Sequence, residues 1–221
     1  MKILVLADEP EKTLWEFLDR RKLENVDLIL SCGDLPSSYL SFLTCFSNAP
    51  ILYVHGNHDD IYDHAPPEGC ICIEDQLYVF RGVRILGLGG SMRYNLGKNQ
   101  YTEHEMARRI RRLRPALRRN QGFDILLAHS PAEGLGDDTD RAHTGFSCFL
   151  RLMEEFHPAF MLHGHVHQNY QFNFKKERAF QDTRVINAYK YTDIELPDPP
   201  LPPPARGLSA LISRFSRYEG P

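Results

Sequence analysis

Short, continuous apolar runs recur along the chain and restrict the folds that it can adopt. Segments with helical spacing separate several of these runs. Continuous apolar runs that alternate with helices are typical of parallel strands that are covered on both faces. We therefore expect an α/β fold, whose main strands are residues 2–7, 26–30, 51–54, 125–128 and 159–162.

Further strands and helices are expected between and after these runs. Residues 71–88 are expected to form an antiparallel set with a turn at Arg81–Gly82, and residues 168–174 and 184–191 a hairpin whose tip includes 174–178. Together these elements predict a two-sheet α/β sandwich. The expected helical segments are residues 13–20, 38–46, 102–119 and 146–156.

Composition excludes several classes of protein. The 221 residues suffice for one substantial domain, and 42% hydrophobic with 25% charged residues is ordinary for a globular chain. The net charge of -3 argues against a nucleic-acid partner. No apolar run approaches the roughly 20 residues that span a bilayer, and the first residues lack the features of a secretion signal.

The cysteines indicate a reducing environment. Cys70 and Cys72 are close enough to form half of a zinc site, but no second pair complements them. Buried, reduced thiols are the favoured interpretation, and they predict a cytoplasmic protein. The five cysteines are Cys32, Cys45, Cys70, Cys72 and Cys148.

The C-terminal segment differs from the rest of the chain. We assign residues 1–195 to one domain and residues 196–221 to a proline-rich linker followed by a short amphipathic helix. This helix can dock on its own domain or on a second copy, which would make a homo-oligomer through the tail. The sequence favours neither option. The apolar residues at helical spacing are Leu208, Leu211, Ile212 and Phe215.

Polar residues follow each of the five main apolar runs. Because ligands bind outside the carboxyl ends of parallel strands, these side chains are expected to converge at one edge of the fold. Carboxylates, an amide oxygen and imidazoles form a mixed nitrogen and oxygen site, which suits Mn, Fe, Zn or Ni better than Ca. In chain order, the motifs are Asp8, Gly33-Asp34, Gly56-Asn57-His58-Asp59, His129 and Gly164-His165-Val166-His167.

This order of motifs resembles the calcineurin-like metallophosphoesterase superfamily, in particular its small bacterial-type phosphodiesterase-like members. The resemblance covers residues 1 to about 190 and makes residues 1–195 the metallophosphoesterase domain. It implies a four-layer αββα sandwich of two mixed β-sheets flanked by helices. It also implies a hydrolase that uses two divalent metal ions, with Mn²⁺ favoured and Fe, Zn or Ni as alternatives.

The resemblance assigns roles to individual residues. Asp34 would bridge the two metals, and a hydroxide between them would attack phosphorus in line. His58 would protonate the leaving oxygen, and Asp59 would orient a histidine. Asn57, His129 and His165 would complete one metal site, and Asp8 and His167 would belong to the other.

One position departs from the family pattern. The family has a second ligand two residues after the first aspartate, where this chain has Pro10, which cannot bind a metal. Glu9 does not replace that ligand easily, because adjacent residues of an extended chain face opposite sides. We expect this metal site to be weaker and to favour Mn²⁺.

The resemblance favours a phosphodiester substrate, either a small molecule or a nucleotide. Arg93 is a candidate substrate contact that can hold a phosphate through two hydrogen bonds, and a surface salt bridge is the alternative for it. His143 is a second candidate, because it lies in an acidic loop like the one that similar family members have beside the site. The alternatives are a non-catalytic interaction scaffold with a weakened metal site, a phosphomonoesterase and a nuclease. The arginine-rich segment 103–120 is the only support for the nuclease, and a solvated amphipathic helix explains that segment better.

Overall fold

The computed structural model describes residues 1–167 and 175–197. Within these residues, a five-stranded sheet has the order β13-β1-β2-β3-β4, in which only β13 is antiparallel to its neighbour. Its strands are β1 (Lys2–Ala7), β2 (Leu28–Ser31), β3 (Ile51–Tyr53), β4 (Ile71–Cys72) and β13 (Lys190–Glu195).

A second sheet has six strands in the order β11-β12-β10-β9-β6-β5. Its four central strands are parallel, and β11 and β5 at the edges are antiparallel to their neighbours. Short strands β7 (Ser91–Met92) and β8 (Gln100–Tyr101) pair separately. The six strands are β5 (Gln76–Phe80), β6 (Val83–Leu88), β9 (Ile125–Ala128), β10 (Phe160–His163), β11 (Glu177–Phe180) and β12 (Thr183–Asn187).

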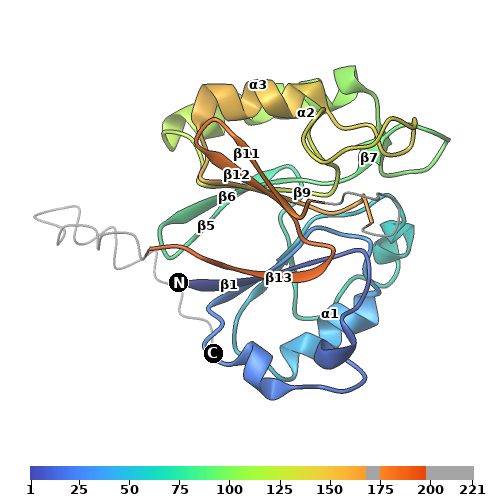
Figure 1. Ribbon diagram of the computed structural model, residues 1–221, viewed down its shortest axis with the longest axis vertical. Helices are drawn as coiled ribbons and strands as arrows, with labels where there is room; N and C mark the ends of the chain where they lie inside the picture. Colours follow the sequence, from blue (N-terminus) through green and yellow to red (C-terminus); the bar gives the residue numbers. More distant parts are fainter. Residues whose placement is uncertain (168–174, 198–221) are drawn as a thin grey trace, which may run out of the picture.

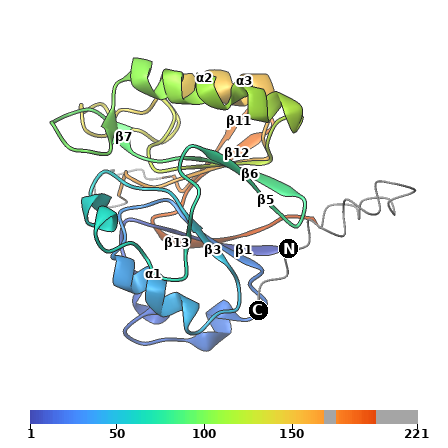
Figure 2. The same cartoon turned by 180° about the vertical axis from the view of Figure 1, so that it is seen from behind.

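The two sheets pack face to face, and helices cover both outer faces (Figures 1 and 2). Helices α2 (Glu103–Arg119) and α3 (Ser147–Phe156) share a core with the second sheet. Helix α1 (Ser37–Thr44) and 3₁₀ turns at Lys12–Leu14 and Arg20–Leu23 cover the first. This arrangement confirms the predicted four-layer αββα sandwich.

Strand β1 shows why the apolar runs are continuous. Ile3 and Val5 belong to the core between the sheets, whereas Leu4 and Leu6 face α1 and the 3₁₀ turns. Successive side chains of a strand point to opposite faces, so a strand that is covered on both faces must be apolar at every position.

No helix among the described residues is both long and apolar enough to cross a membrane.

Several expected elements differ in the structure. Residues 13–20 do not form an α-helix, because Glu11 and Asp19 cap backbone N–H groups and divide the segment into short 3₁₀ turns. Strand β4 pairs with β3 in the first sheet instead of joining an antiparallel set. The turn at Arg81–Gly82 is confirmed, since both residues have a positive φ between the antiparallel strands β5 and β6.

The last described strands also differ from the predicted hairpin. The described hairpin pairs β11 with β12, so its tip is at residues 181–182 and not at 174–178. The chain then crosses to the first sheet, where β13 pairs with β1. Apolar runs indicate that a strand is buried but not which sheet it joins. Residues 168–174 and the tail helix predicted after residue 207 lie outside the described residues.

Helix α2 buries an arginine. Its apolar residues Met106, Ile110 and Leu117 are in the core, as the amphipathic pattern predicts. Arg109 is only 7% exposed, and it donates to Asp75 at 2.8 Å, to the Gly89 carbonyl at 2.8 Å and to Glu74. Arg109 therefore links α2 to residues that follow β4 and β6.

Glu74 extends this network toward the carboxyl end of β3. Its carboxylate accepts the backbone N–H groups of His55 at 3.1 Å and Gly89 at 2.9 Å. Burial works to raise the pKa of Glu74, but His55 and Arg109 outweigh it and lower that pKa. The carboxylate therefore stays charged, with His55 and Arg109 as its partners.

The loops after β2 and β3 touch backbone to backbone. A Cβ atom at Gly33, which has a φ of +95°, would lie 2.2 Å from the Gly56 nitrogen. Glycine is required here by both the positive φ and the lack of space. This contact fixes the distance between the two loops.

We predict that Arg109→Met lowers the free energy of unfolding by about 3–5 kcal/mol, because it removes one of the two charged partners of the buried Glu74 carboxylate. The neighbouring exposed Arg108 provides the control. Arg108→Met should change that free energy by no more than about 0.5 kcal/mol. Urea unfolding measures both, and equal effects would contradict the structural role of Arg109.

We predict that Gly33→Ala lowers the free energy of unfolding by about 2–5 kcal/mol, from backbone strain and displacement of Gly56. Gly134 is a matched control, since its φ is +75° but nothing lies within 4 Å of a Cβ there. Gly134→Ala should lower the free energy of unfolding by only about 1–2 kcal/mol. Thermal unfolding of both variants tests this, and equal losses would show that the two loops separate easily.

Candidate metal centre

The ends of five strands converge at one edge of the fold, beside a cavity. Asp8 follows β1, Asp34 lies beyond β2, and the loop with Asn57 and His58 follows β3. The second sheet contributes His129 after β9 and His165 after β10. The cavity has a volume of about 330 Å³ and is lined by Asp8, Asp34, Asn57, His58, Tyr94, Ala142, His143, His165 and His167.

Three of these residues adopt a left-handed backbone conformation that is uncommon outside glycine. The φ angles are 66° at Asp8, 57° at Asp34 and 69° at His165. Such residues cost of order 1–3 kcal/mol each and persist only where surrounding contacts enforce them. Here Asp8 accepts the His165 N–H at 2.8 Å, and Asp34 accepts the His58 N–H at 2.8 Å.

Asp59 holds two loops together. One of its carboxylate oxygens accepts the N–H groups of Gly56 at 2.7 Å and Asp34 at 2.8 Å. Burial, reinforced by the charge of Asp34, raises the pKa of Asp59 to about 6. The sequence predicted that Asp59 orients a histidine, but its hydrogen bonds are to backbone N–H groups of the β2 and β3 loops.

The two central histidines point lone pairs toward one another. His129 Nδ1 lies 2.9 Å from the Cys32 carbonyl oxygen, and His165 Nε2 lies 2.7 Å from that of Ala142. A carbonyl oxygen only accepts, so these nitrogens carry the protons. The remaining nitrogens, His129 Nε2 and His165 Nδ1, are 3.1 Å apart.

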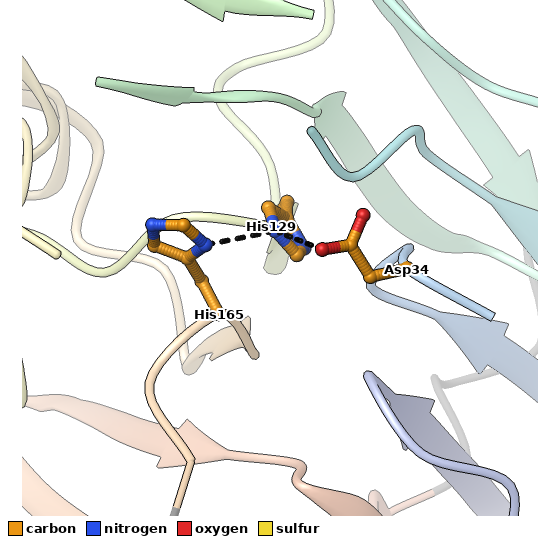
Figure 3. Close-up of side chains that lie close together, drawn as sticks. All are labelled: Asp34, His129 and His165. Carbon is orange, nitrogen blue, oxygen red and sulfur yellow. Dashed lines mark hydrogen bonds and ion pairs between the residues drawn. The ribbon is translucent and has the colours of Figure 1, made fainter. Parts of the chain in front are cut away.

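Oxygen atoms approach the same point. His129 Nε2 lies 3.0 Å from Asn57 Oδ1 and 3.4 Å from Asp34 Oδ2. The candidate ligand atoms of Asp34, His129 and His165 all lie within 4.8 Å of one another (Figure 3). Acceptor atoms that face each other in this way repel unless a positive charge, either a proton on His129 Nε2 or a cation, lies between them. This donor set therefore fits a divalent metal ion.

The pKa values of the groups at the centre shift in opposite directions. Burial works to lower the pKa of His129, but Asp34 and other carboxylates raise it to about 9. Burial lowers the pKa of His165 to about 3. Burial works to raise the pKa of Asp34, but His129 and the His58 N–H lower it. The carboxylates thus favour one positive charge at the position that a metal would take.

Asp8 supplies a second candidate position. Its side chain is completely buried, and burial raises its pKa to about 7. Among the described residues, Asp8 Oδ2 has no hydrogen-bond partner. His167 Nε2 lies 3.9 Å from Asp8 Oδ1. A buried carboxylate oxygen without a partner, beside an imidazole, also fits a metal ion.

Positions 9 and 10 contribute no ligand to the cavity. The Glu9 carboxylate accepts a hydrogen bond of 2.5 Å from the Tyr189 hydroxyl and lies 3.1 Å from Lys190 Nζ. Pro10 lines a different cavity, together with Trp15. The expectation that Glu9 faces away from the site agrees with this geometry.

The two predicted substrate contacts lie in different places. His143 lines the cavity, its ring is 5.2 Å from that of His165, and Asp140 lies 2.8 Å from its Nδ1. Arg93 lies 2.9 Å from Glu105 and lines a separate cavity of about 270 Å³. The structure therefore brings His143, but not Arg93, to the candidate centre.

Tyr94, whose side chain lines the cavity, is not among the predicted site residues. The sequence predicts a substrate contact at its neighbour Arg93 instead. No local pattern separates the two residues. Side-chain direction in an irregular loop cannot be read from hydrophobic periodicity.

Comparisons with known proteins bear on the family and the fold of this chain. Residues 1–169 match the calcineurin-like phosphoesterase family. No curated protein gives a significant match to the sequence. The crystal structure of TT1561 of Thermus thermophilus has a TM-score of 0.59 and 15% identity, and the similarity covers 85% of this chain and 88% of TT1561. That structure therefore has a similar fold.

Two larger proteins contain a less similar region. For the 5′-nucleotidase from Candida albicans, the TM-score is 0.47 at 12% identity, with 85% of this chain and 44% of that one covered. For the Thermus thermophilus sulfate thiohydrolase SoxB, the TM-score is 0.41 at 12% identity, with 74% and 33% covered. Since the family match extends over residues 1–169 of the 221, the chain belongs to the calcineurin-like phosphoesterase family.

Proposed function

We propose that this chain hydrolyses a phosphodiester with two divalent metal ions held at the shared edge of its sheets. The observation that carries this proposal is the convergence of the acceptor atoms of Asp34, His129 and His165 in a family of phosphoesterases. One metal would be held by Asp34, Asn57, His129 and His165, and the other by Asp8, Asp34 and His167.

The metals would lower the pKa of a bound water and offset negative charge on the phosphoryl oxygens. We propose Mn²⁺, because the second position offers one imidazole and otherwise carboxylates, and oxygen-rich sites suit that ion. Glu9 and Pro10 add nothing to this position. The second metal is therefore expected to bind more weakly than the first.

His58 is proposed as the general acid. Its side chain is exposed and lines the cavity, while its backbone N–H donates to Asp34 at 2.8 Å. The backbone is thus fixed to the metal-binding carboxylate, and the imidazole is left free to reach a substrate. Protonation of the leaving oxygen by such a group typically contributes 10²–10⁴-fold to the rate.

The charge of the cavity supports a phosphodiester over a phosphomonoester. No lysine or arginine is among the described residues that line it, whereas Asp8 and Asp34 are. A phosphomonoester dianion is commonly held by arginine or lysine in addition to metals. A diester carries a single negative charge and needs less positive charge from the protein.

The second candidate function is a binding scaffold whose metal centre no longer turns over a substrate. The missing ligand at Pro10 favours it, because one metal position has three protein ligands only. We prefer hydrolysis, since a catalytic metal commonly has three protein ligands and an open position.

The test is hydrolysis of bis-p-nitrophenyl phosphate by protein that has been stripped of metal and then supplied with Mn²⁺. We expect turnover only with metal, and a higher kcat/KM than for the monoester p-nitrophenyl phosphate. Absence of turnover with Mn²⁺, Fe²⁺, Zn²⁺ and Ni²⁺ in a folded protein would favour the scaffold.

In the same assay, His58→Asn should lower kcat by about 10²–10⁴-fold, because the leaving oxygen loses its proton donor. The bound metal, measured by atomic emission, should match the wild type. His64→Asn is the control, since His64 is exposed and does not line the cavity. Loss of metal from the His58 variant would make this histidine a ligand and contradict its role as an acid.

A further inference from the structure

We infer that the Tyr94 hydroxyl is a catalytic hydrogen-bond donor to a phosphoryl oxygen of the substrate. The inference rests on the proposed function and adds to it a residue from outside the motifs of the family. Tyr94 and Asn57 both line the cavity, although 37 residues separate them in the chain.

The direction of one hydrogen bond leaves the hydroxyl proton available. Asn57 Nδ2 donates to the Tyr94 oxygen at 3.1 Å, so that oxygen is the acceptor. A phenol can accept one hydrogen bond and still donate another. Among the described residues, no acceptor for the Tyr94 proton is found. Because the side chain borders the cavity, the proton is free to be donated into it.

The metal centre would strengthen this donor. Asn57 Oδ1 lies 3.0 Å from His129 Nε2 and so faces the candidate metal position. An amide whose oxygen faces a cation becomes a stronger N–H donor, and a phenol that accepts from it becomes a stronger O–H donor in turn. Asn57 therefore links the charge at the centre to the Tyr94 proton.

A buried glutamine fixes the tyrosine in place. Gln100 is 2% exposed, and its Oε1 accepts the N–H groups of Tyr94 at 3.2 Å and Asn95 at 3.1 Å. Its Nε2 donates to Asn95 Oδ1 at 2.7 Å. These bonds hold the loop before a substrate arrives, and a preorganised donor in a cavity is most effective.

A neutral donor also suits the rest of the cavity. No lysine or arginine is among the described lining residues. The side-chain donors there are Asn57, Tyr94 and the imidazoles of the lining histidines. A phosphodiester presents two non-bridging oxygens that share one negative charge. A metal and a phenol can each take part of that charge, which is the arrangement that we assign here.

Tyr94→Phe removes the hydroxyl and keeps the ring. With Mn²⁺ and bis-p-nitrophenyl phosphate, we expect kcat/KM to fall about 10- to 100-fold, as for the loss of a hydrogen bond to a charged group. Calorimetric affinity for Mn²⁺ should stay within about threefold of the wild type. The control is Tyr78→Phe, because Tyr78 lies on β5 and does not line the cavity.

A binding experiment separates this inference from the proposed function. Inorganic phosphate should bind the Mn²⁺-loaded Tyr94 variant about 10-fold more weakly than the wild type in calorimetry. Wild-type turnover reports on the function, and the difference between variant and wild type reports on Tyr94. Equal kcat/KM and equal phosphate affinity would overturn the inference. Weaker Mn²⁺ binding would also overturn it, because Tyr94 would then only support Asn57.

Discussion

Three carboxylates, those of Asp8, Asp34 and Asp59, are buried together where the two sheets meet, and their mutual repulsion determines what the surrounding structure must supply. Hydrogen bonds from backbone N–H groups stabilise part of that negative charge. Asp59 accepts two of them, Asp34 accepts one from His58, and Asp8 accepts one from His165. Among the described residues, one oxygen of Asp8 still has no partner. The centre therefore needs a positive charge, which either a proton on His129 or a bound cation can supply.

The fold makes this concentration of charge possible. Parallel strands bring residues that are distant in sequence to one edge, and left-handed residues at Asp8, Asp34 and His165 turn the chain there. The close contact of Gly33 with Gly56 sets the spacing of two loops, and the Arg109–Glu74 pair holds the neighbouring loops to α2. Stability elsewhere in the sandwich must offset the strain and burial at this edge. The residues that contribute to the cavity are therefore held by structure that extends well beyond it.

The sequence predicted the architecture, and the convergence of Asp34, His129 and His165, for one physical reason. Apolar runs indicate where buried strands form, and strands β1 and β9 begin and end at the expected residues. Polar residues directly after such runs must lie at the same edge, which is how Asp34, His129 and His165 could be identified. The pairing of β4 and β13, the burial of Arg109 and the direction of Tyr94 were not predictable. Each depends on contacts between segments that are distant in sequence, and local hydrophobic periodicity does not indicate such contacts.

The most direct test of the metal centre is an anomalous difference map from crystals of the protein soaked in Mn²⁺. We predict a strong peak in contact with Asp34, Asn57, His129 and His165. We also predict a second, weaker peak in contact with Asp8, Asp34 and His167, because Pro10 and Glu9 provide no ligand there. A map without a peak in this cavity would contradict the proposal that the buried carboxylates and imidazoles are a metal-binding site.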